Sequence, residues 1–162
     1  MASRVDVESP FGFYNFANVL LTRSTDGGKT WSSPVRVNND PLQSSSGSSR
    51  DHFQPGVAVD SIGTVAACWY DRRDAPVNYR VSRFCGISTD HGASWTNTRV
   101  DPTNWQPIHA TDVFINPYYL GDYDTVVSDR LMMSAGFQGA YGKVTVSAPV
   151  PNQDVFLVQL NK

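Results

Sequence analysis

An eight-residue segment occurs twice in this chain, and its repetition constrains the fold more than any other feature. The first copy occupies residues 24–31 (STDGGKTW) and the second occupies residues 88–95 (STDHGASW). Each copy follows a run of strand-forming residues. Its aspartate can fold back onto backbone N–H groups, and its glycine tolerates a positive φ, as a tight turn requires. The octets therefore predict two equivalent hairpin turns and an internal repeat.

Both octets end in a tryptophan at the start of the next expected strand. Burial of such a ring stabilises a fold by roughly 2–3 kcal/mol, so we expect both indoles to be buried. The positions to which we assign a structural role in the turns are Ser24, Asp26, Gly28, Trp31, Ser88, Asp90, Gly92 and Trp95.

The composition favours strands over helices and excludes some classes of partner. The chain has 162 residues, a net charge of −2 and a single glutamate, Glu8. Glycine and proline interrupt it at short intervals, as in all-β folds. A nearly neutral chain offers no basic surface for nucleic acid. No apolar run is long enough to span a membrane.

The middle of the chain, residues 52–101, contains one complete structural unit. Its expected strands are residues 53–60, 64–70, 79–88 and 96–100, with the second octet between the last two. This order predicts a four-stranded antiparallel meander. The second strand is almost wholly apolar, which indicates burial on both faces of the sheet.

Partial copies of this unit flank it on both sides. In residues 1–51 we expect strands at 13–23 and 34–38 around the first octet, after an irregular start over residues 1–11. In residues 102–162 the expected strands are 124–129, 131–137 and 154–161, and the last of these matches residues 18–25.

The octets resemble the Asp-box (BNR repeat) of sialidases and related β-propellers, in which this box is the turn between the third and fourth strands of a blade. The resemblance implies an all-β segment of about two to three blades, too few to close a propeller, which typically has about 4–8. The remaining blades would come from a longer parent chain, which we favour, or from self-association.

The resemblance also places an active site on the rim opposite the octets. Residues of this chain that fall on that rim could hold the carboxylate of a sugar through arginine, or stack on its ring through tyrosine. The binding candidates are Arg50, Arg72, Arg73, Tyr79, Tyr118 and Tyr119, and the catalytic candidates are Asp51 and Asp71. The other interpretation of this loop, which we favour, is a solvated salt-bridge knot of Asp71, Arg72 and Asp74.

The chain departs from the catalytic set of the family. Sialidases of this kind use a tyrosine nucleophile activated by a glutamate, but Glu8 lies in the irregular start, and Phe53-Gln54-Pro55 lacks the arginine of the family signature. We therefore expect a part of an extracellular, secreted sialidase or related glycoside hydrolase that is not catalytic alone. The alternative is a non-catalytic propeller module that binds a glycan or a protein.

No cofactor or metal is expected. Asp122 and Asp124 are the nearest approach to a Ca²⁺ site, but two carboxylates fall short of six to eight oxygen ligands, and a simple turn is favoured. Cys68 and Cys85 fall on neighbouring strands of one hairpin. They could form a cross-strand disulfide or remain reduced and buried, and of these we favour the reduced pair.

Overall fold

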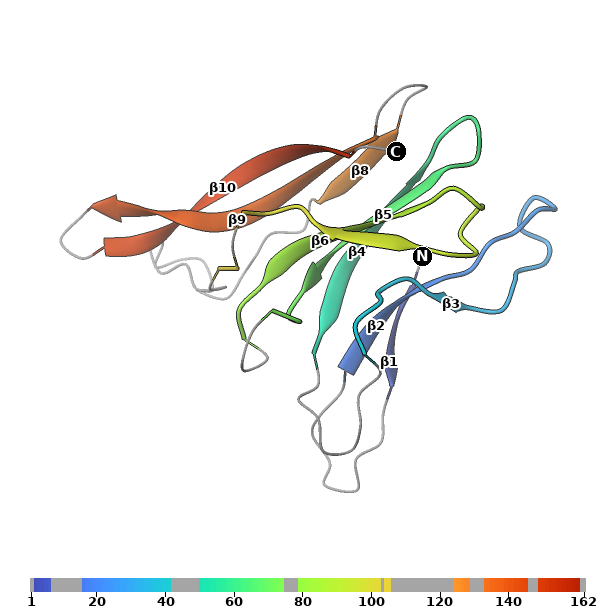
Figure 1. Ribbon diagram of the computed structural model, residues 1–162, viewed down its shortest axis with the longest axis horizontal. Helices are drawn as coiled ribbons and strands as arrows, with labels where there is room; N and C mark the ends of the chain where they lie inside the picture. Colours follow the sequence, from blue (N-terminus) through green and yellow to red (C-terminus); the bar gives the residue numbers. More distant parts are fainter. Residues whose placement is uncertain are drawn as a thin grey trace, which may run out of the picture.

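The computed structural model describes most of the chain. The described residues are 2–6, 16–41, 50–74, 79–102, 104–105, 124–128, 133–145 and 149–160. They contain no helix, and hence none that could cross a membrane. Their strands form three antiparallel sheets that pack face to face (Figure 1). The all-β, antiparallel class predicted from the sequence is confirmed.

Each sheet is built from strands that are consecutive in the chain. The first sheet contains β1 (Ala2–Asp6), β2 (Phe16–Leu21) and β3 (Val35–Arg36), and the central sheet contains β4 (His52–Val59), β5 (Val65–Asp71), β6 (Ser82–Ser88) and β7 (Thr96–Arg99). The third sheet contains β8 (Thr125–Ser128), β9 (Met133–Thr145) and β10 (Pro149–Leu160). The four-stranded meander predicted for the middle of the chain is therefore confirmed.

The central sheet is covered on both faces, as the apolar character of its second strand predicts. Every residue of β5 is buried. Side chains alternate between the faces of a strand, so Ala67 and Trp69 face the first sheet, while Ala66 and Cys68 face the third. The three sheets thus form one stack with β5 near its middle.

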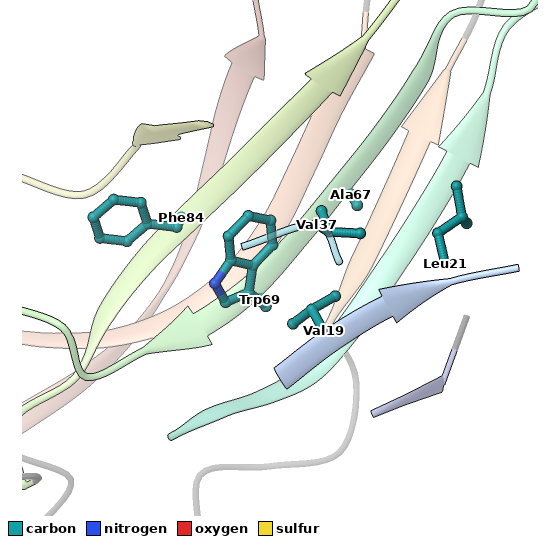
Figure 2. Close-up of a cluster of buried hydrophobic side chains, with 6 residues drawn as sticks. All are labelled: Val19, Leu21, Val37, Ala67, Trp69 and Phe84. Carbon is teal, nitrogen blue, oxygen red and sulfur yellow. The ribbon is translucent and has the colours of Figure 1, made fainter. Parts of the chain in front are cut away.

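The interface between the first and central sheets is an apolar cluster. Figure 2 shows its members converging from the two sheets, and they are Val19, Leu21, Val37, Ala67, Trp69 and Phe84. Trp95, from the second octet, packs against the same cluster. Its ring is partly buried, so the second octet contributes to the contact between sheets as well as to its own turn.

The interface between the central and third sheets contains a disulfide. Cys68 of β5 and Cys85 of β6 are directly opposite in the strand register, with their Cα atoms 4.0 Å apart, and their sulfurs are bonded. Our preference for reduced cysteines was wrong, because the register of neighbouring strands was not fixed by the sequence. Val126 and Leu160 of the third sheet pack on this pair.

Two further expectations were wrong. Residues 2–6, expected to be irregular, form β1 and pair with β2. Trp31 is 63% exposed although Trp95 packs between sheets. The first octet lies on the outer sheet of the stack, where no described element covers its tryptophan.

Candidate functional site

The first octet is a turn closed by its own side chains. The Oγ atom of Ser24 donates to Oδ1 of Asp26 (2.8 Å) and accepts from the N–H of Gly28 (2.8 Å). Asp26 also accepts from the N–H and the hydroxyl of Thr30 at 2.9 and 2.6 Å. These hydrogen bonds, those from Thr30 above all, lower the pKa of Asp26 from 3.8 to about 2.

The second octet repeats this arrangement. Ser88 donates to Asp90 (2.7 Å) and accepts from the N–H of Gly92 (2.7 Å). Asp90 accepts from the N–H and the hydroxyl of Ser94 at 2.8 and 2.6 Å. Hydrogen bonds, first that of the Ser94 hydroxyl, hold the pKa of Asp90 well below its ordinary value. All of these residues stabilise the turn itself, and the octets connect equivalent strands, β2 to β3 and β6 to β7.

The candidate site lies at the other end of the central sheet, where β4 begins and β5 ends. Arg72 follows β5, and its N–H donates to the backbone oxygen of Asp51 just before β4 (3.1 Å). Its guanidinium is 3.7 Å from the Asp51 carboxylate and lies over the ring of Phe53, 5.2 Å from the centroid. Burial lowers the pKa of Arg72, against the opposing effects of Asp51 and Tyr79.

This group of residues, which we call the rim cluster, is the part of the expected site that the structure brings together. Its members are Asp51, Phe53, Arg72 and Tyr79. The side chains of Arg72 and Asp51 keep 23% and 25% of their surface exposed. Arg50, which precedes Asp51 in the chain, is partly buried. The cluster therefore combines a half-buried cation and aromatic rings at a solvent-accessible edge, as recognition of an anionic group requires.

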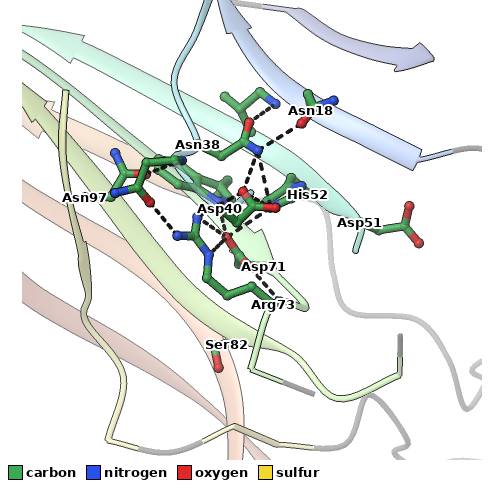
Figure 3. A network of polar contacts seen from close by, with 12 residues as sticks. Asn18, Asn38, Asp40, Asp51, His52, Asp71, Arg73, Ser82 and Asn97 are labelled. Atoms are coloured by element: carbon green, nitrogen blue, oxygen red, sulfur yellow. Dashed lines mark hydrogen bonds and ion pairs between the residues drawn. The ribbon is translucent and has the colours of Figure 1, made fainter. Parts of the chain in front are cut away.

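Asp71 and Arg73, on either side of Arg72 in the chain, make their contacts inside the protein. Asp71 is fully buried and accepts from the indole N–H of Trp69 (2.8 Å) and from the N–H and Nε of Arg73 (2.7 and 2.8 Å). Arg73 also donates to Asn39 (2.6 Å). Both residues were candidates for the rim, and the structure instead places them in a network between the first and central sheets (Figure 3).

His52 and Asp40 complete this network. The Nε2 atom of His52 is 3.1 Å from Asp40 and 3.3 Å from Asp71, and its Nδ1 atom is 2.8 Å from the backbone oxygen of Ala17. The contact with the carbonyl oxygen of Ala17 places a hydrogen on Nδ1, because a carbonyl oxygen only accepts. Burial opposes ionisation of Asp40, but hydrogen bonds from His52 and Asn38 and the charges of His52 and Arg73 keep its pKa well below its ordinary value.

A second polar group joins the central and third sheets. The fully buried Arg83 donates to the carboxylate of Asp124 (3.3 Å), which also accepts from the hydroxyl of Tyr70 (3.0 Å). The ring of Tyr70 lies 5.4 Å from Phe53 and 6.0 Å from Trp105. Asp124, a weak candidate for a metal ligand, is therefore held by two protein donors.

The expected salt-bridge knot does not form as one unit. Asp71 pairs with Arg73, Arg72 pairs with Asp51, and Asp74 lies 3.3 Å from Arg99. Within the described part of the chain, no group of three or more metal-binding side chains is present. Tyr118, Tyr119 and Asp122 lie outside the described residues.

Arg83 and the role of Asp40 were not predicted from the sequence. Arg83 stands within β6, where period-two alternation places it on the face of Cys85 that contacts the third sheet. Alternation along β5 likewise places Asp71 on the face of Trp69, and the same period of two, continued past the end of the strand, reaches Arg73. This alternation could have indicated that Arg73 and Arg72 lie on opposite faces. Nothing comparable marks Asp40, because it follows the two-residue strand β3.

No protein-family model matched the chain, and no curated protein sequence matched it. Inferences about function therefore depend on the geometry described above.

Proposed function

We propose that this chain is a segment of a sialidase-like Asp-box β-propeller that contributes one rim of a carbohydrate-binding site. One observation carries the proposal. Two octets with the same internal hydrogen bonds close equivalent turns in two sheets that pack face to face. Successive antiparallel meanders stacked in this way are the building plan of a propeller.

The rim cluster is the proposed contact with the sugar. Arg72 offers a planar cation that can pair with a sugar carboxylate, and Phe53 and Tyr79 offer aromatic surface beside it. The pairing of Arg72 with Asp51 is long, at 3.7 Å, and about a quarter of each side chain is exposed to solvent. A ligand carboxylate can therefore compete for the guanidinium at little cost.

One observation favours the non-catalytic alternative, a glycan-binding module. Asp71, one of the two catalytic candidates, is completely buried and already accepts hydrogen bonds from Trp69 and Arg73. Asp51 then remains as the only candidate carboxylate that the described part of the rim exposes. Hydrolysis of a glycoside normally needs two groups that flank the bond, so this segment acts in catalysis only with residues supplied from elsewhere.

An extracellular location belongs to the same proposal. The disulfide between Cys68 and Cys85 supports it, because disulfides persist mainly in oxidising compartments.

Titration of the protein with sialyllactose, followed by NMR, tests the proposal. We expect Arg72→Ala to weaken binding by about tenfold or more, since a hydrogen bond to a charged group contributes roughly 1.5–3 kcal/mol. Lys29→Ala is the matched control, because Lys29 is an exposed cation in the first octet, away from the rim. Turnover of a fluorogenic sialoside by the same variants separates hydrolysis from binding.

Two results would overturn the proposal. One is the absence of any sialyllactose-induced shift at millimolar concentration, and the other is equal binding by the Arg72→Ala variant and the unmodified protein. Binding without turnover would support the glycan-binding module over the hydrolase.

A further inference from the structure

Both ends of the stack of sheets expose large apolar side chains. At one end, Trp31 of the first octet is 63% exposed. At the other, Val127 of β8 is 54% exposed and Leu157 of β10 is 79% exposed. Val126 and Val158 pack towards the central sheet. Their neighbours Val127 and Leu157 therefore occupy the opposite, outer face of the third sheet.

The interface between the first and central sheets shows how such residues fit together. Trp95 packs against the cluster that contains Leu21. The methyl carbon Cδ2 of Leu21 lies so close to Gly92 that a Cβ atom on that glycine would collide with it. The glycine of the second octet thus leaves room for a leucine from the neighbouring sheet.

The exposed residues are the counterparts of this pair. Trp31 holds the same place in the first octet as Trp95 in the second, and Gly28 holds that of Gly92. Residues 154–161 match residues 18–25, so Leu157 is the counterpart of Leu21. The nearest described atom to a Cβ built on Gly28 is Cζ2 of Trp31, at 4.0 Å. No leucine fills that place in the described structure.

We infer that two copies of this chain associate head to tail, with Leu157 of one copy packed against Gly28 and Trp31 of the other. This contact has the same form as the packing that already joins the first and central sheets, and it lies at the two ends of the stack. Counting only the sheets of the described residues, two copies bring six together, within the range of about 4–8 that a closed ring of sheets uses. The inference depends on the stack of sheets and not on the proposed sugar ligand.

Mass in solution is the first test. Light scattering coupled to gel filtration is expected to give twice the mass of one chain. Trp31→Arg and Leu157→Arg are each expected to give a single chain, because each places a charge in the apolar contact. Ile62→Arg is the control, since Ile62 is 75% exposed but lies in the turn between β4 and β5. A single chain at every concentration of the unmodified protein would overturn the inference.

Disulfide trapping tests the direction of the contact. A Trp31→Cys variant and a Leu157→Cys variant are oxidised separately and then as a mixture. Head-to-tail packing predicts a covalent dimer in the mixture and none in either variant alone. Covalent dimers within one variant would show a symmetric contact and overturn the inference, as would the absence of a covalent dimer in the mixture. Sialyllactose binding, measured in parallel, reports on the proposed function independently.

Discussion

Two aspartates that look equivalent in the sequence should differ strongly in their contribution to stability. Asp71 and Asp74 flank the same pair of arginines. The carboxylate of Asp71 is completely buried and accepts hydrogen bonds from Trp69 and from the N–H and Nε of Arg73. Asp74 is exposed and pairs with Arg99 at 3.3 Å. We compare Asp71→Asn with Asp74→Asn.

The magnitudes follow from the two environments. Asp71→Asn leaves the Arg73 guanidinium buried, with its nearest remaining carboxylate contact 3.6 Å away at Asp40. Removing one partner of a buried ion pair costs roughly 3–5 kcal/mol. An exposed pair contributes about 0–1 kcal/mol. We therefore expect Asp71→Asn to lower the free energy of unfolding by about 2–5 kcal/mol more than Asp74→Asn.

Urea unfolding followed by tryptophan fluorescence measures this difference. Trp69 is a built-in reporter, because its indole N–H donates directly to Asp71. The slope of the unfolding free energy against urea concentration should be unchanged, so the difference in stability should appear as a shift of the midpoint urea concentration. Equal midpoints for the two variants would show that the network of Asp71 and Arg73 does not hold the first and central sheets together.

Two further predictions concern the octets. In a single chain that is not associated with a second copy, Gly92→Ala should destabilise the fold by about 1–3 kcal/mol more than Gly28→Ala. Both glycines have a φ of +88°, but only Gly92 faces a leucine of the neighbouring sheet. Equal thermal midpoints of the two variants would contradict this. The pKa of Asp26 is lower in the folded than in the unfolded chain, so its stabilising effect is present above about pH 4 and is lost as the pH falls towards about 2. Asp26→Asn should therefore reduce the loss of stability over this pH range. An unchanged loss of stability in the variant would refute the prediction.

The sequence predicted those parts of the fold that depend on local patterns. The hydrogen bonds of the octet serine and aspartate side chains described above stay within each octet, so residues 24–31 and 88–95 could be interpreted without knowledge of the neighbouring strands. The apolar run of β5 likewise indicated two covered faces. These features needed only turn chemistry and the alternation of a strand.

Features that depend on contacts between sheets could not be predicted in this way. Trp31 and Trp95 end matching motifs, and only the presence of a neighbouring sheet makes one packed and the other exposed. The pairing of Cys68 with Cys85 depends on a register that a one-residue slip would have changed. Of the candidate site, Arg72 pairs with Asp51 and not with the neighbouring aspartates, whereas Arg73 pairs with the buried Asp71.

The burial of β5 on both sides has a consequence for synthesis of the chain. The first sheet is synthesised before β5, so the face of β5 that packs on the first sheet can be covered as soon as β5 is made. The face that carries Ala66 and Cys68 waits for β8 and β10, some sixty to ninety residues later in the chain. A nascent chain therefore passes through a stage with one uncovered apolar surface, and that surface favours aggregation until the third sheet packs on it.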